Sequence, residues 1–98
     1  MDRRELLDEW SFPYEQRHGV TLISRNDSIK CLELIYEHDC DFWGYDAFNI
    51  SSEDKIRPHL SESASYKGDR PALQTVISMI EDSPVEVTHY EFVFSKTT

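Results

Sequence analysis

The last segment of the chain, from Val85 to Ser95, restricts the possible folds more than any other part of the sequence. Valines and aromatic residues alternate along it with the two-residue period of a β-strand. Both faces of this strand are largely apolar, one with Val85, Val87 and Val93 and the other with Tyr90, Phe92 and Phe94. Such a strand needs cover on both sides, and we expect it at the centre of a sheet.

A helix before this strand has the next clearest pattern. Asp69 is a suitable N-cap, and Pro71 fits the first helical turn. The apolar residues that follow have helical spacing and form one stripe: Leu73, Val76, Ile77 and Ile80. The sequence therefore predicts a helix that buries this stripe.

Three further elements are expected in the first forty residues. Residues 2–5 have the pattern of a capping box and open a short helix that Pro13 ends, which we interpret as docking on the domain rather than forming its core. A short β-branched strand follows over residues 19–24, and a helix over residues 28–38 has its cap at residues 26–28. The expected apolar faces are Leu6, Leu7 and Trp10 in the first helix, and Ile29, Leu32, Ile35 and Tyr36 in the second.

The middle of the chain has weaker patterns. Residues 41–48 are rich in aromatic side chains but interrupted by Gly44, and we interpret them as loop and turn. Residues 55–60 form a short strand that Pro58 confines to a sheet edge, and the serine-rich residues 61–68 form a loop. This order predicts a small single-domain α/β sandwich over residues 1–98, with an about three-stranded, partly parallel sheet packed by two to three helices.

Charge and composition limit the possible partners. A formal net charge of −9 over 98 residues argues against direct binding to nucleic acid or to an anionic membrane. The N-terminal part has no apolar run of signal-peptide length, and no run of about eighteen apolar residues occurs, so we expect a cytoplasmic protein. Cys31 and Cys40 are too few for a disulfide framework, and we expect reduced thiols.

The stretch from Cys31 to Asp54 contains seven carboxylates and no lysine or arginine. Uncompensated carboxylates raise the local negative potential, and the aromatic residues among them offer large contact areas. One interpretation is a surface that grips a basic partner, and the other is a solvated helix face followed by an acidic strand. Under the first interpretation, the partner-binding residues are Glu33, Glu37, Asp39, Asp41, Trp43, Tyr45 and Asp46.

Within this stretch, Phe42 and Trp43 form an aromatic pair, Gly44 follows, and residues 46–48 form an acidic step. Together with the layout of residues 19–95, this run resembles the barstar family of intracellular ribonuclease inhibitors and other bacterial toxin-immunity proteins. The resemblance implies that the run joins the first helix to an acidic second helix, which plugs the basic active site of a nuclease. It implies an immunity protein, or antitoxin, that neutralises a cognate toxin. The link after Gly44 is shorter than in the family, and Ile50 stands where the family has a further acid.

Two other classes of function remain open from the sequence. One is a nucleic-acid mimic or another regulatory module for a basic protein. A mimic should spread carboxylates along a long face at roughly phosphate spacing, whereas here they concentrate in one stretch. A small enzyme would have to use His18, His38, His59, His89 or the two cysteines, but none of these lies in a catalytic motif. Residues 38–41 gather metal-capable groups, yet adjacent ligands cannot all turn to one ion. We therefore expect a basic protein partner, no enzymatic activity, and no metal or cofactor.

Overall fold

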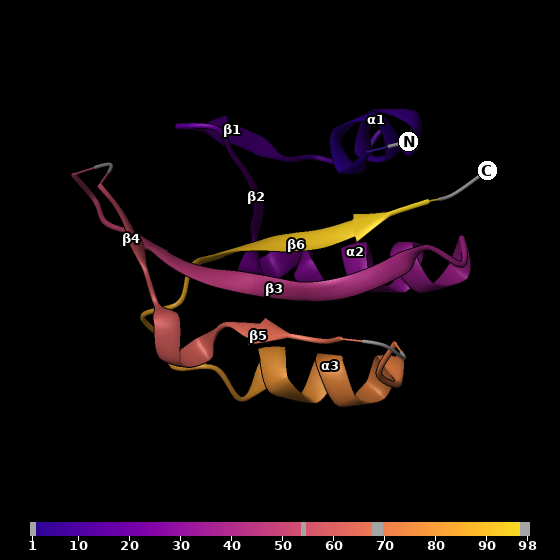
Figure 1. The fold of residues 1–98 in the computed structure, drawn as a ribbon. Coiled ribbons are helices and arrows are strands. Elements are labelled where there is room, and N and C mark those ends of the chain that lie inside the picture. The colour runs from indigo at the N-terminus through magenta and orange to yellow at the C-terminus, as the bar shows by residue number, and fades with distance from the viewer. Residues whose placement is uncertain (1, 54, 68–69, 97–98) are drawn as a thin grey trace.

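The computed structural model describes residues 2–53, 55–67 and 70–96 (Figure 1). Its helices are α1 (Arg3–Glu9), α2 (Arg25–Glu37) and α3 (Leu73–Glu81). Its strands are β1 (Glu15–Arg17), β2 (Val20–Ser24), β3 (Asp41–Ile50), β4 (Ile56–Pro58), β5 (Ala64–Ser65) and β6 (His89–Ser95), and a 3-10 turn covers Leu60–Glu62. None of the described helices is long and apolar enough to cross a membrane.

The sheet is antiparallel throughout. Its strands follow the order β1-β2-β6-β3-β4, and β5 pairs with β3 beside that path. The sheet curls like half of a barrel, with α2 behind it in the view of Figure 1 and α3 below. The predicted three-stranded, partly parallel sandwich is therefore wrong. The strands missing from the prediction are β1, β3 and β5; β1 and β5 have three and two residues, too few to show an alternating pattern in the sequence.

Strand β6 lies between β2 and β3 near the centre of the sheet, as the sequence predicts. Its core face, which α2 covers, carries three buried aromatic residues: Tyr90, Phe92 and Phe94. The strand begins at His89 rather than at Val85, which is 87% exposed in the preceding loop. The central position is confirmed, while the predicted start is too early.

Strand β3 runs through the segment predicted to be loop and turn. A β-bulge at Trp43 shifts the register between Phe42 and Gly44, so the two-residue period breaks inside the strand. Beyond the bulge, Tyr45 and Ala47 continue the core face of Phe42. The loop interpretation is wrong for this reason. The acidic second helix implied by the resemblance is likewise absent from this segment, which is described in full and is strand.

The close approach of β5 explains the glycine at position 44. Gly44 has a φ of +141°, and a Cβ placed on it would collide with the carbonyl oxygen of Ala64 and come within 3.0 Å of the Cα of Ser65. Gly19 also has a positive φ, +78°, but no described atom lies within 4 Å of its Cβ position. Steric contact therefore distinguishes these two glycines.

We expect Gly44→Ala to lower the free energy of unfolding by about 3 kcal/mol, because β5 must move and the backbone is also strained. Gly19→Ala adds only the strain of a positive φ, about 1 kcal/mol. Urea denaturation of both variants measures the difference. Equal losses would show that β5 does not approach position 44 as described.

Helix α1 begins as the capping pattern predicts, since the side chain of Asp2 accepts a hydrogen bond from the backbone N–H of Glu5 at 3.0 Å. Leu6 and Leu7 are each 1% exposed and belong to the main apolar cluster. The interpretation of α1 as a docking helix outside the core is therefore wrong. Two adjacent leucines are enough to insert this short helix into the core.

Helix α2 is confirmed, but it begins at Arg25, and Ser24 occupies the N-cap position instead of residues 26–28. The side chain of Ser24 donates to Asp27 at 3.0 Å rather than to the helix backbone. The buried apolar residues of α2 are Cys31, Leu32 and Ile35. Of the predicted apolar face, Leu32 and Ile35 are therefore buried, while Ile29 and Tyr36 are only partly buried. The helix is about one turn longer at its start.

Helix α3 is also confirmed, with Val76 and Ile80 fully buried. It begins at Leu73, so Pro71 precedes the helix instead of lying in its first turn. The predicted cap, Asp69, lies outside the described residues.

The predicted edge strand of residues 55–60 is confirmed as β4, and Pro58 lies in it at the edge of the sheet. The predicted loop of residues 61–68 is only partly correct. Within its described part it contains the end of the 3-10 turn and strand β5, which pairs with β3. Two paired residues are too short a strand to recognise from a serine-rich sequence.

Arg25 connects the start of α2 to the end of α3. Its guanidinium donates hydrogen bonds of 2.6 to 3.5 Å to the backbone carbonyls of Ile80, Glu81, Ser83, Pro84 and Val87. Carbonyls at a helix C-terminus have no partner within the helix, and this one side chain supplies partners for α3 and the loop after it. Arg25 thereby fixes the packing of α3 and the entry into β6.

Both cysteines are free and buried, in agreement with the expected reduced thiols. Burial raises the pKa of Cys31 to about 12 and also raises the pKa of Cys40. Since thiolate is the reactive form, we expect neither thiol to react with dithionitrobenzoate at pH 8 in the native protein, and both to react after unfolding. Rapid reaction of Cys31 in the native state would contradict its placement in the core.

Candidate functional site

The fold divides the seven candidate residues among three places. Glu33 and Glu37 lie on α2. Asp39 lies in the turn after α2, and Asp41 begins β3. Trp43, Tyr45 and Asp46 lie further along β3. All are exposed except Tyr45. The seven residues therefore do not share one surface, although they are close in sequence.

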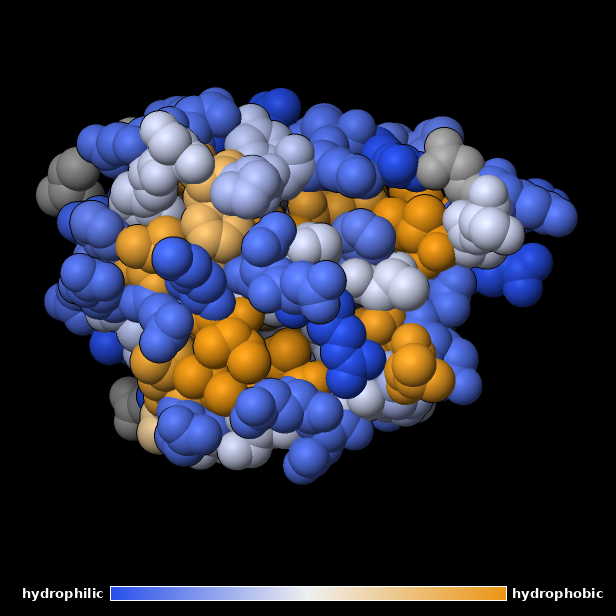
Figure 2. All heavy atoms as spheres, turned by 180° about the vertical axis from the view of Figure 1, so that it is seen from behind, coloured by the Kyte–Doolittle hydropathy of each residue, from blue (hydrophilic) through white to orange (hydrophobic). Residues whose placement is uncertain are grey.

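Glu33 and Glu37 are exposed on the side of α2 that points away from the sheet. Beside them, Leu34 is partly buried, as are Leu73 and Ile77 of the neighbouring helix α3. Figure 2 shows this side of the molecule, where apolar side chains gather in the lower half among hydrophilic ones. We call the exposed side of α2 that carries Glu33, Leu34 and Glu37 the α2 face.

The acidic character continues past the end of α2. Asp39 has a side chain that is 91% exposed and a φ of +55°, so the chain leaves the helix through a left-handed residue. The last turn of α2 contains no basic residue, although the negative end of the helix dipole favours cations there. The carboxylates of Glu37, Asp39 and Asp41 add negative charge near this end of the helix. The arrangement is unfavourable for the free helix and favourable for an approaching basic group.

Arg70 offsets part of this negative charge. Its guanidinium lies 3.4 Å from the Asp39 carboxylate, donates to the carbonyl of Cys40 at 2.9 Å, and stacks 4.4 Å above the ring of Tyr36. Because Asp39 is almost fully exposed, this ion pair contributes little to stability. The Asp39 carboxylate therefore remains accessible to a cation from outside.

Asp46 lies on the other side of the sheet. It pairs with Glu91 of β6, whose side chain is on the face opposite to the buried Phe92. Glu91 is held by Arg3 at 3.4 Å, whereas Asp46 is exposed. The sheet thus separates Asp46 from the α2 face. Trp43 is 44% exposed and lies at the bulge, two residues beyond Asp41.

Tyr45 is 3% exposed and does not lie on an open surface. Its ring packs edge-on against Tyr90 and Phe92, with centroid distances of 5.7 and 6.2 Å. Tyr45 also lines a cavity of about 230 Å³ beside the 3-10 turn. Burial, with smaller contributions from Tyr66, Tyr90 and Glu62, raises the pKa of Tyr45 to about 12. The hydroxyl is therefore neutral at physiological pH.

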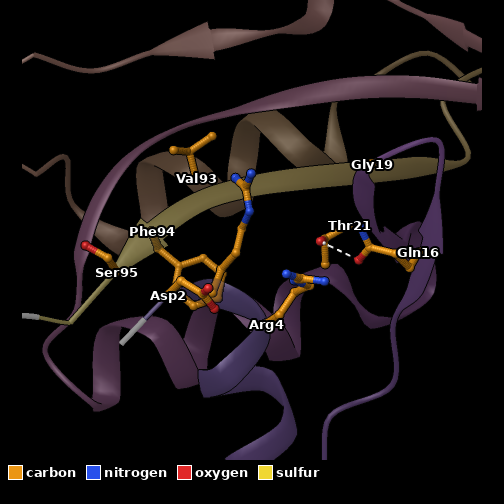
Figure 3. A pocket seen from close by; sticks show the side chains of 9 residues that line it. Asp2, Arg4, Gln16, Gly19, Thr21, Val93, Phe94 and Ser95 are labelled. Atoms are coloured by element: carbon orange, nitrogen blue, oxygen red, sulfur yellow. Dashed lines mark hydrogen bonds between the residues drawn. The ribbon is translucent and has the colours of Figure 1, made fainter.

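A second hollow, of about 540 Å³, lies where β2 and β6 diverge (Figure 3). Ile23 and Ser24 of β2 pair with β6, and beyond these residues side-chain interactions take the place of backbone hydrogen bonds between the two strands. Glu91 accepts from the backbone N–H of Thr21 at 3.0 Å, and Arg3 donates to the carbonyl of Phe92 at 3.4 Å. The ion pair between Arg3 and Glu91 therefore bridges the gap in the sheet.

The remaining lining of this hollow combines polar side chains with the apolar Val93 and Phe94. Figure 3 shows Arg4 directed toward Thr21 and Gln16, whose side chains are joined by a 3.0 Å hydrogen bond. The lining contains no histidine or cysteine, and its carboxylate, Asp2, caps α1. These residues are placed to hold α1 against the sheet, and they do not form a nucleophile with a base.

The arrangement of the histidines and cysteines does not form a metal site in the described ranges. No group of three metal-capable side chains occurs among the residues described. The fold directs residues 38–41 apart, with Cys40 buried and Asp39 and Asp41 exposed. His89 shares a 2.8 Å hydrogen bond with the hydroxyl of Thr88, and burial lowers its pKa, as suits a structural histidine.

No protein-family model matches this chain, and no curated protein or solved structure is significantly similar to it.

The sequence analysis did not identify Glu62 and Asp82, which line the smaller cavity with Tyr45. They come from the 3-10 turn and from the end of α3, and no local pattern connects positions so far apart.

Proposed function

We propose that this chain is an acidic binding protein that inhibits a basic protein by placing the α2 face and the adjoining turn against it. One observation carries the proposal: Glu33, Glu37 and Asp39 are exposed at the negative end of α2, beside partly buried apolar residues. The apolar area provides affinity, while the carboxylates provide steering and specificity.

A nuclease is the class of partner that fits this surface best. Its active site is built to bind phosphates, and carboxylates on a docking protein carry a similar charge. The resemblance of residues 42–48 to the toxin-immunity proteins adds support, although these residues belong to a strand here. We therefore propose an immunity protein that acts in the cytoplasm against a cognate bacterial toxin.

The binding surface in this proposal is smaller than the sequence prediction. Glu33, Glu37 and Asp39 form its acidic part, and Asp41 and Trp43 extend it around the turn. Asp46 is on the opposite side of the sheet, and Tyr45 is buried, so neither belongs to this surface.

Capture of proteins from extract of the native host tests the proposal. The baits are the wild type, a variant with Glu33→Gln, Glu37→Gln and Asp39→Asn, and a control in which three other exposed acids are neutralised by Glu5→Gln, Glu9→Gln and Glu86→Gln. We expect the wild type and the control to retain a basic protein and to inhibit its nuclease activity. The α2-face variant should retain much less of it.

Equal retention by all three baits would contradict the α2 face as the binding surface. A basic protein that depends on the α2 face but has no nuclease activity would instead support the alternative, a regulatory module for another basic protein. The matched control separates both outcomes from a general effect of lost negative charge.

A further inference from the structure

The cavity beside the 3-10 turn has two acidic residues in its lining. Its volume is about 230 Å³, and it is lined by Tyr45, Ser61, Glu62, Ser63, Met79 and Asp82. Two carboxylates therefore face one small space from different elements, the 3-10 turn and the end of α3. Neither Glu62 nor Asp82 forms an ion pair with a described residue.

The side chain of a buried tyrosine also lines this space. Tyr45 is 3% exposed, and its hydroxyl forms no hydrogen bond with any described residue. Its ring is fixed in the core against Tyr90 and Phe92, so the hydroxyl end is the part that reaches the cavity. Because this hydroxyl opens on the cavity and has no partner in the protein, a group bound there can form a hydrogen bond with it.

A second tyrosine repeats this feature nearby. The hydroxyl of Tyr90 is fully buried and has no hydrogen-bond partner among the described residues. The hydroxyl of Ser83 is near enough to lower the pKa of Tyr90, but it does not meet hydrogen-bond geometry with it and donates to the carbonyl of Met79 at 3.0 Å. Burial chiefly raises the pKa of both Tyr45 and Tyr90, and the negative charge of Glu62 adds a smaller contribution to each.

We infer that this cavity binds an organic cation, a primary ammonium or a guanidinium group, between the carboxylates of Glu62 and Asp82 and the hydroxyl of Tyr45. An ammonium group has three donors and no acceptor, and the cavity offers it two carboxylates and a hydroxyl oxygen. Hydrogen bonds of this charge-assisted kind are about twice as strong as neutral ones.

The size of the cavity also fits such a group. A volume of about 230 Å³ corresponds to roughly eight water molecules at about 30 Å³ each, enough for the charged group and part of an aliphatic stem. Met79 provides an apolar wall for the stem, and its sulfur is fixed by a 3.3 Å hydrogen bond from Tyr66. The site uses residues different from those of the α2 face and does not depend on the function proposed for that face.

Titration with n-butylammonium, followed by amide NMR shifts of residues 61–63 and Tyr45, tests the inference. The neutral analogue n-butanol is the ligand control. We expect saturable shifts with the ammonium compound alone. Glu62→Gln should weaken binding about tenfold or more, and Tyr45→Phe about threefold, because the ring remains in place. Glu86→Gln removes an exposed carboxylate outside the cavity and should leave binding unchanged.

A blocked lysine, N-acetyl-lysine methylamide, identifies the source of the cation. If the blocked lysine binds as well as n-butylammonium, the natural cation is a basic side chain of a protein. If n-butylammonium binds and the blocked lysine does not, the natural cation is a small amine. The inference is overturned if n-butylammonium gives no saturable shifts, if n-butanol binds equally well, or if Glu62→Gln binds like the wild type while its circular dichroism is unchanged.

Discussion

We expect Arg25→Met to lower the free energy of unfolding by about 4 kcal/mol, as measured by urea denaturation. The guanidinium of Arg25 donates to five backbone carbonyls at the end of α3 and in the following loop. A hydrogen bond that involves a charged group contributes about 1.5 to 3 kcal/mol, and carbonyls that lose a partner while partly buried add a further penalty. Some of them will regain water, which limits the total.

Two further substitutions separate the geometry of Arg25 from its charge. Arg25→Lys keeps the charge but offers three donors from one point, so we expect it to recover less than half of the lost stability. Arg57→Met, at an exposed position of β4, should change stability by less than about 0.5 kcal/mol. A loss of less than about 1 kcal/mol in Arg25→Met would show that these carbonyls do not depend on Arg25.

We expect the combined α2-face variant, Glu33→Gln, Glu37→Gln and Asp39→Asn, to bind the captured partner about thirtyfold more weakly. Each carboxylate contributes roughly 0.7 kcal/mol, chiefly by increasing the association rate. Removing like charges from the negative end of α2 should leave the free protein as stable as the wild type or slightly more stable. Binding and stability therefore change in opposite directions, which loss of folding cannot explain.

Stopped-flow association at two salt concentrations measures this effect. The wild-type association rate should fall about tenfold between low and physiological salt, and the rate of the variant should fall much less. A wild-type association rate that does not depend on salt would show that electrostatic attraction does not steer this association.

The sequence predicts the elements whose own pattern is strong. The centre of the sheet at β6 follows from alternating apolar residues, and helices α2 and α3 follow from their stripes. The pattern fails at β3, because the bulge at Trp43 puts Phe42 and Tyr45 on the same face. The topology was also inaccessible, since β1 and β5 are too short to be recognised and, with β3, they complete the antiparallel sheet.

The same reasons explain how much of the candidate site the sequence could predict. Exposure of Glu33 and Glu37 follows from their positions opposite the apolar stripe of α2. The separation of Asp46 and the burial of Tyr45 depend on the register of β3 against β6, which no local pattern specifies. The role of Arg25 depends on tertiary contacts with the end of α3, so its sequence neighbours carry no signal for it.

Amide NMR shift mapping of the complex with the captured basic protein tests the central proposal most directly. The proposed docking predicts the largest shifts in the second half of α2 and in the turn as far as Trp43, with smaller shifts along the exposed side of α3. Residues of β1 and of the diverging part of β2 should change little. Largest shifts at β1 and β2, with α2 unchanged, would contradict the α2 face as the surface that binds the basic partner.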